Sequence, residues 1–210
     1  MTLPGYTIAQ WALFFFSYSF LGWVWESGYV SIREGRWVNR GFLHGPVLPL
    51  YGSGAVAILL ITLPAAQNAA LVFLLGMAGA TLLEYVTGSV LEAVLHRRYW
   101  DYSMHRWNLQ GRVCLISSLC WGVFSLALAR LLHPLLSGWL TALPASIAAA
   151  AALALSLLTA ADALASLRGA ARLLTAGAVP AGRKPARSGQ PALPGTYRRK
   201  YIGPRPKPLP

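Results

Sequence analysis

The sequence predicts an all-α membrane protein: a polytopic bundle of about five transmembrane helices with its N-terminus outside and a disordered basic cytoplasmic tail. The first observation is composition, because 56% of the residues are hydrophobic and only 11% are charged. The mean hydropathy of +0.50 is too high for a soluble domain. The second is that the apolar residues form five long runs. The third is that the arginines, apart from Arg130 near the outer end of the fourth run, are confined to alternate loops and the C-terminal region.

The length of each run indicates whether it can be a transmembrane span, since about 20 apolar residues cross the hydrocarbon core. The second run is the shortest, and Pro49 and Gly52 near its start predict an irregular first turn. We expect the chain between His133 and Ala142 to be a loop. The five expected spans are Thr7 to about Tyr29, Val47 to Leu63, Ala69 to about Leu95, Val113 to Leu132, and roughly Leu143 to Leu167.

Loop charges predict the orientation. Arginines lie between the first and second spans and between the third and fourth, whereas residues 64–68 and 133–142 contain neither Lys nor Arg. By the positive-inside rule, the two arginine-rich loops and the tail face the cytoplasm. The protein is therefore expected in the cell membrane as a multi-pass protein, with the bilayer as its first partner.

The chain divides into a predicted helix bundle, residues 1–175, and a tail, residues 176–210. The tail is rich in Pro, Gly and Arg and cannot bury a core, so we expect it to be disordered and to contact anionic lipids of the inner leaflet. About ten of the 18 basic residues lie from Arg168 onward. The net charge of +12 thus reflects topology, and no nucleic-acid partner is expected.

Four of the six acidic residues fall on or at the ends of predicted spans: Glu26, Glu84, Glu92 and Asp162. Glu84 is the deepest, where an acidic group costs roughly 2.5 to 3.5 kcal/mol on insertion scales. It needs a polar partner, a protonated state or a hydrated cavity. Glu84 and Glu92 are about 12 Å apart along one helix and share a face with Gly76, Ala80 and Gly88. We expect this small and acidic face to point into the bundle.

Two interpretations of these acids remain open. Glu26 and Glu92 can pair with Arg40 and Arg112 and fix helix packing. Alternatively, the acids form a site, with Glu84 facing a polar cavity near Glu92, Arg40 and Arg112. Asp162, one turn before Ser166, fits either interpretation.

The two cytoplasmic loops are too rich in aromatic and polar residues for plain connectors. His44 and His105 could act as metal ligands, but no HxxxH or CxxC spacing supports this, so we expect neither a metal nor another cofactor. No P-loop, GxSxG or dinucleotide motif occurs, and no residue can be named as catalytic from the sequence.

The stretch between Phe14 and Leu126 contains a combination of short motifs: Tyr18-Ser19-Phe20-Leu21-Gly22-Trp23-Val24-Trp25-Glu26, Asn39-Arg40-Gly41-Phe42-Leu43, Leu83-Glu84-Tyr85, Leu91-Glu92, Trp100-Asp101-Tyr102-Ser103 and Asn108-Leu109-Gln110-Gly111-Arg112. Together they resemble the "Putative ABC-transporter type IV" (CmpB-like) membrane protein family. One departure is Gly45-Pro46-Val47-Leu48-Pro49-Leu50-Tyr51-Gly52, where the family usually has Gly-Pro-Tyr/Cys-Pro-Ile-Tyr-Gly.

The resemblance implies a permease-like protein with several spans, and it leaves a separate ATPase subunit or a homo-oligomer open as partners. Asp162 with Ser166 is similar to the polar end of the family's last helix. The site residues that it implies are Glu26, Asn39, Arg40, Glu84, Glu92, Trp100, Asp101, Asn108 and Arg112.

Three functions are compatible with these observations. The first is a transport component whose acidic site, in the inner half of the bundle, takes a cation, a proton or a polar solute. The second is a membrane-embedded enzyme or lipid-handling protein acting at the cytoplasmic leaflet. The third is a structural or assembly role. The family places transport first.

Overall fold

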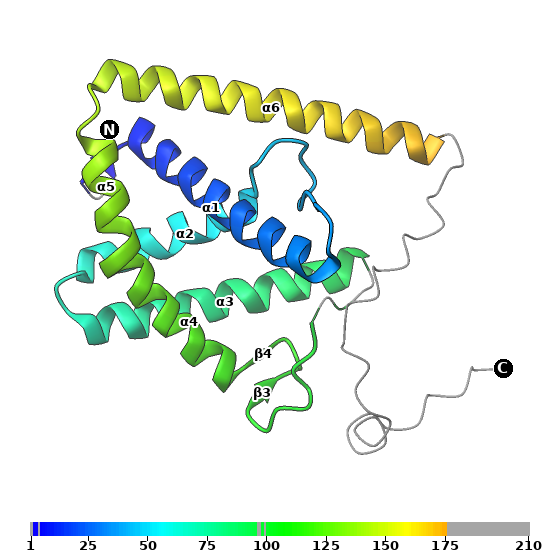
Figure 1. Ribbon diagram of the computed structural model, residues 1–210. Helices are drawn as coiled ribbons and strands as arrows, with labels where there is room; N and C mark the ends of the chain where they lie inside the picture. Colours follow the sequence, from blue (N-terminus) through cyan, green and yellow to red (C-terminus); the bar gives the residue numbers. More distant parts are fainter. Residues whose placement is uncertain (1, 4, 96–97, 99, 176–210) are drawn as a thin grey trace.

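The structure is a computed structural model that describes residues 2–3, 5–95, 98 and 100–175 (Figure 1). The described chain is an all-α bundle, as predicted. The tail expected at residues 176–210 lies outside the described residues, so the boundary between bundle and tail stays a prediction.

Four helices are long and apolar enough to cross a membrane: α1, α3, the continuous helix formed by α4, η2 and α5, and α6. The 14-residue helix α2 is shorter and is extended by a 3₁₀ turn, η1. The bounds are α1 (Ile8–Glu34), α2 (Pro49–Thr62), η1 (Leu63–Ala65), α3 (Ala69–Leu95), α4 (Leu115–Ala127), η2 (Leu128–Leu132), α5 (His133–Thr141) and α6 (Ala145–Thr175).

Polar side chains cap the N-termini of three of these helices, because they accept hydrogen bonds from backbone N–H groups that have no partner within the helix. Thr7 and Gln10 form a capping box at α1. Asn68 accepts hydrogen bonds from the N–H groups of Ala70 and Leu71 at α3, and Cys114 caps α4. Two short antiparallel hairpins complete the fold: β1 (Thr2–Leu3) with β2 (Tyr6–Thr7), and β3 (Asn108–Leu109) with β4 (Val113–Cys114).

The prediction of a loop between His133 and Ala142 is wrong, because the chain continues there as helix α5. Pro134 lies in the first turn of α5, and the π-helical stretch η2 precedes it. A wider π turn accommodates the proline where a regular helix would be broken. His133 is only 2% exposed and bonds the hydroxyls of Tyr18 (2.9 Å) and Tyr6 (3.1 Å). These tertiary contacts hold the segment against α1.

The bundle is built from neighbouring pairs: α3 packs along α4, α1 along α2, and α6 along α1 (Figure 1). The main core lies where α1, α2, α3 and η2 meet, around the fully buried Phe14, Leu59 and Val72. Between α1 and α6, Leu13 packs on Ala148 and Ala152. Small residues let α6 approach closely, so it packs against the bundle, as its Ala-rich sequence predicts.

The helix pairs α1–α2 and α3–α4 form two helical hairpins, called the inner hairpins because their loops lie on the predicted inner side. In each of them the second helix starts well before the level at which the first helix ends. The N–H of Leu48, just before α2, donates to the carbonyl of Ser19, about 22 Å before the end of α1. Ser117 of α4 contacts Glu84, about 16 Å before the end of α3. The loops 35–48 and 98–114 therefore fold back alongside α1 and α3. Irregular backbone at such depth is expected only where protein or water surrounds it.

Candidate functional site

The predicted site residues fall into two polar clusters, one on each inner hairpin. The α3–α4 cluster contains Glu84, Glu92, Arg98, Trp100, Asp101, Tyr102, Asn108, Gln110, Arg112, Ser117 and Trp121. The α1–α2 cluster contains Trp23, Glu26, Asn39, Arg40, His44, Tyr51, Asp162 and Ser166.

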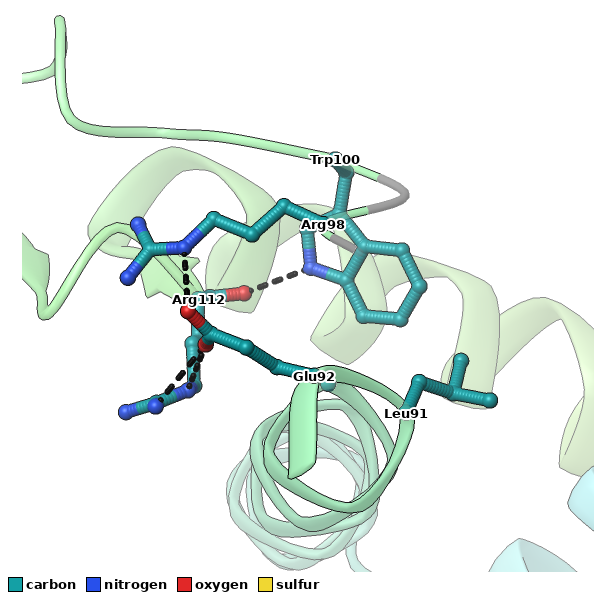
Figure 2. A pocket seen from close by; sticks show the side chains of 6 residues that line it. Leu91, Glu92, Arg98, Trp100 and Arg112 are labelled. Carbon is teal, nitrogen blue, oxygen red and sulfur yellow. Dashed lines mark hydrogen bonds and ion pairs between the residues drawn. The ribbon is translucent and has the colours of Figure 1, made fainter. Parts of the chain in front are cut away.

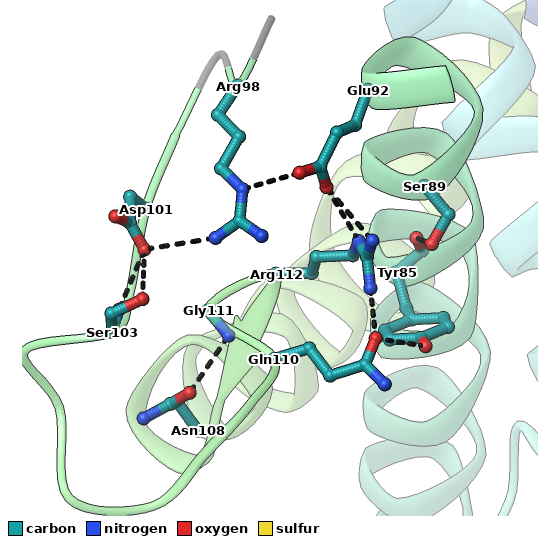
Figure 3. A network of polar contacts seen from close by, with 10 residues as sticks. All are labelled: Tyr85, Ser89, Glu92, Arg98, Asp101, Ser103, Asn108, Gln110, Gly111 and Arg112. Carbon is teal, nitrogen blue, oxygen red and sulfur yellow. Dashed lines mark hydrogen bonds and ion pairs between the residues drawn. The ribbon is translucent and has the colours of Figure 1, made fainter. Parts of the chain in front are cut away.

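Glu92 is the centre of the α3–α4 cluster (Figure 3). Arg98 Nε donates to its Oε1 at 2.8 Å, while Arg112 Nε and Nη2 donate to its Oε2 at 3.2 and 2.9 Å. Arg112 also donates to Gln110 and lies 5.5 Å from the centre of the Tyr85 ring. Since both arginines come from the loop, these bonds fasten the loop to α3.

Asp101 and Gly111 shape the same loop. Asp101 lies 3.8 Å from Arg98 Nη1 and accepts hydrogen bonds from the Ser103 hydroxyl and N–H, which lower the pKa of the Asp101 carboxyl. Gly111 has φ +71°, and a Cβ there would lie 2.6 Å from Asp101 Oδ1. Asn108 Oδ1 accepts from the Gly111 N–H at 2.9 Å. Only glycine fits this close turn.

A small pocket lies beside Glu92 (Figure 2). Its volume is about 10 Å³, room for about one water molecule. Trp100 closes one side and donates through its indole N–H to the carbonyl of Arg112 at 2.8 Å. The lining residues are Gly88, Leu91, Glu92, Arg98, Trp100 and Arg112. Glu84 does not line this pocket.

Glu84 is held by three neutral donors from outside its own helix. Tyr102 Oη donates to Oε1 at 3.1 Å, and Trp121 Nε1 donates to Oε2 at 2.9 Å. Ser117 Oγ lies 3.4 Å from Oε2 but only 2.9 Å from the carbonyl of Cys114, so its single proton is shared. Burial, followed by the charge of Glu84, raises the pKa of Tyr102 to about 12, which keeps its hydroxyl a donor.

Among the described residues, Glu84 is the one acidic side chain with no basic group within ion-pair distance. The expectation that Arg40 lies beside it is wrong, because Arg40 pairs with Glu26 on the other hairpin. The pairs formed by the other acids are Glu26 with Arg40, Glu34 with Arg36, Glu92 with Arg98 and Arg112, Asp101 with Arg98, and Asp162 with His44.

The small face of α3 is covered by α4 and its loop, as the spacing predicts. A Cβ on Gly76 would lie 2.1 Å from the Ser125 side chain of α4, and one on Gly88 would lie 3.2 Å from Trp100. Ala80, between them, is buried. Close approach of the two helices is what lets Trp121 reach Glu84.

In the α1–α2 cluster, Glu26 accepts hydrogen bonds from Arg40 Nε at 3.3 Å and from the Tyr51 hydroxyl at 2.7 Å. Asn39 accepts from the Trp23 indole N–H at 2.6 Å and donates to the carbonyl of His44 at 2.9 Å. These bonds hold the loop against α1 and α2, the role that the packing interpretation gives to Glu26 and Arg40.

Asp162 joins α6 to this loop. It accepts from the N–H groups of His44 (3.1 Å) and Gly45 (2.8 Å) and contacts His44 Nδ1 at 2.8 Å. Ser166 Oγ contacts the same Nδ1 at 2.9 Å. A catalytic triad needs serine and aspartate on opposite ring nitrogens. This trio is therefore a clamp between α6 and the loop.

Sequence reasoning missed Tyr102, Ser117 and Trp121 as partners of Glu84. Tyr102 belongs to a recognised motif, but Trp121 carried no signal, because its contact depends on the register between α3 and α4. In the part of the chain that the structure describes, no three His, Cys, Asp or Glu side chains are grouped to hold a metal ion.

No curated protein and no solved structure matches the chain. The family model described as "Putative ABC-transporter type IV" matches residues 13–167, a range that includes both polar clusters. With four helices able to cross a membrane, the chain is a multi-pass membrane protein that belongs to this family.

Proposed function

We propose that the protein is the membrane component of a transporter of the cytoplasmic membrane and that Glu84 is its cation site. The family description supports transport. The observation that carries the site is the coordination of Glu84, whose carboxylate binds Tyr102, Trp121 and Ser117 and, among the residues that the structure describes, no basic side chain. A charge at this depth is costly unless a ligand or a polar surrounding offsets it.

The neutral donors explain why Glu84 can bind reversibly. A carboxylate paired with arginine would have to break charge-assisted bonds before taking a cation, whereas hydroxyl and indole donors leave the negative charge uncompensated. Donors that point at both oxygens also fix the orientation of the carboxylate. Glu84 lies about 16 Å from the inner end of α3. The Tyr102 loop, folded back along α3, gives a polar connection between this depth and the predicted cytoplasmic face.

The remaining acids have structural roles in this proposal. The pairs Glu26–Arg40 and Glu92–Arg112 fasten the loops that bring polar groups to the site. Energy would come from a separate ATPase subunit, for which the loops 35–48 and 98–114 at the predicted inner face provide the docking surface. A membrane-embedded enzyme has weaker support, because the Ser166, His44 and Asp162 trio lacks triad geometry.

The test uses the full chain, purified in detergent, and its thermal unfolding with and without added cations. Glu84→Gln keeps the size and most of the hydrogen bonding, because its amide oxygen can still accept from Trp121 and its NH2 group can donate to the Tyr102 hydroxyl, but it removes the charge. Glu34→Gln is the matched control, because Glu34 is an acid at the end of α1, outside both clusters. A bound cation at 100 times its dissociation constant stabilises by about 2.7 kcal/mol. We expect wild type and Glu34→Gln to show this stabilisation with at least one of sodium, potassium and tetramethylammonium, and Glu84→Gln to lose it.

Glu84→Leu distinguishes the alternatives. If Glu84 serves packing alone, Leu in its place should raise stability and preserve cellular function. Cation stabilisation that is equal in wild type and Glu84→Gln would likewise exclude Glu84 as the site. Under our proposal, both variants insert normally and both are inactive.

A further inference from the structure

An apolar groove runs along the helix formed by α4, η2 and α5. Its volume is about 380 Å³, and its lining residues are Phe124, Ala127, Leu128, Leu131, Leu132 and Leu135. Phe124, Leu131 and Leu135 are each more than 60% exposed in the described structure. The groove follows the π-helical stretch, where a widened turn often marks a functional site.

The groove and the Glu84 site share one helix face. Trp121, which donates to Glu84, is in edge contact with Phe124 at 6.0 Å between ring centres. After Trp121, one face of this helix carries a stripe of apolar residues at the three- and four-residue spacing of a helical face. The stripe consists of Phe124, Leu128, Leu131 and Leu135. From Trp121 to Leu135 the stripe is about 21 Å long. The carboxylate of Glu84 thus lies at one end of a long apolar track.

On the basis of the proposed function, we propose that the ligand of this site is a lipophilic cation: an amine or quaternary ammonium group at Glu84 with an alkyl chain in the groove. Charge complementarity selects the head group, since Glu84 has no basic partner among the described residues. The Trp121 ring, 37% exposed, adds a face that attracts cations. The groove contains no polar residue, so the chain must be apolar.

The same geometry disfavours other occupants. An anionic or zwitterionic phospholipid would bring a phosphate towards the unpaired carboxylate, and its two chains would exceed a track that is one helix face wide. A second copy of this chain would cover the groove but would leave Glu84 uncompensated. A small inorganic cation would satisfy Glu84 and leave the groove without a role.

The test is binding of dodecyltrimethylammonium to the full chain in phosphatidylcholine nanodiscs, measured by titration calorimetry. Tetramethylammonium supplies the head without the chain, and dodecyl sulfate supplies the chain with the opposite charge. Leu131→Trp fills the exposed groove with a larger side chain. Leu158→Trp, at an exposed apolar position on α6, controls for an added tryptophan.

We expect saturable binding of dodecyltrimethylammonium to wild type and Leu158→Trp, at least tenfold tighter than that of tetramethylammonium, and no binding of dodecyl sulfate. Glu84→Gln and Leu131→Trp should each weaken it at least tenfold, and Leu131→Trp should leave tetramethylammonium binding unchanged. If Leu131→Trp has no effect while Glu84→Gln abolishes binding of both cations, the cation site stands and the lipophilic ligand is wrong. If Glu84→Gln binds every cation as wild type does, the proposed function fails as well. Equal binding of dodecyl sulfate would identify a nonselective groove for alkyl chains.

Discussion

Replacing Gly76 by alanine should separate α3 from α4 and disturb the Glu84 site two turns away. The added Cβ would lie 2.1 Å from Ser125 Cβ and 2.3 Å from its Oγ. Unstrained carbon contacts need about 3.5 Å or more, so the helices must move apart by roughly 1.4 Å or distort. Overpacking of this kind costs about 1 to 3 kcal/mol, whereas alanine in place of helical glycine recovers about 0.5 to 1 kcal/mol. We expect a net loss of about 1 to 2 kcal/mol.

The measurement is thermal unfolding in detergent, with cation stabilisation as a second readout, because Glu84 and Trp121 bond across the same helix pair. Adding Ser125→Gly removes the obstructing atoms and should restore both stability and cation stabilisation. Gly138→Ala is the matched control, since a Cβ there meets nothing within 4 Å; it should be neutral or slightly stabilising. A Gly76→Ala protein as stable as wild type, or one that Ser125→Gly fails to rescue, would show that this contact does not set the helix spacing.

Three further predictions concern topology, the tail and pH. Reporter fusions at Gln67 and Gly177 should lie on opposite sides of the membrane; the same side for both would refute the orientation or the number of spans. A chain truncated after Gly177 should insert and elute on size exclusion as the full chain does, because the tail cannot bury apolar surface; loss of the folded species would mean that the tail docks on the bundle. The folded pKa of Tyr102, about 12, exceeds the usual value of about 10, so the stability it adds is complete below pH about 10 and is lost as the pH approaches 12. The difference in melting temperature between wild type and Tyr102→Phe should therefore shrink from pH 9 to pH 11.5, and a constant difference would contradict this assignment.

The helix bundle could be predicted because span length and hydropathy are local properties of the sequence. The pairs Glu26–Arg40 and Glu92–Arg112, expected under the packing interpretation, also form. They could be anticipated because each joins a helix to the loop that follows it, and few other partners are within reach. Hydropathy also placed the start of α3 correctly at Ala69.

Features that depend on tertiary contacts could not be predicted. The helix through Pro134 continues because η2 accommodates it and His133 binds Tyr18 and Tyr6, residues more than a hundred positions away. The partners of Glu84 depend on the register between α3 and α4, which close contacts such as Gly76 on Ser125 set. Hydropathy indicates the glycine but not which residue opposes it.

The α3–α4 cluster contains an arginine close to Glu84, yet Glu84 has no basic partner among the described residues. Arg112 lies 5.5 Å from the Tyr85 ring, and its Cβ is 3.8 Å from the position of a Cβ on Gly88, so it runs along the α3 surface within a turn of Glu84. Its guanidinium nevertheless binds Glu92 through two nitrogens and Gln110 through a third. Arg98 on the other oxygen of Glu92 strengthens this arrangement, because it orients the carboxylate that Arg112 binds. Glu92 therefore keeps Arg112 away from Glu84, and the ion pair that fastens the loop also preserves the uncompensated charge on which a cation site depends.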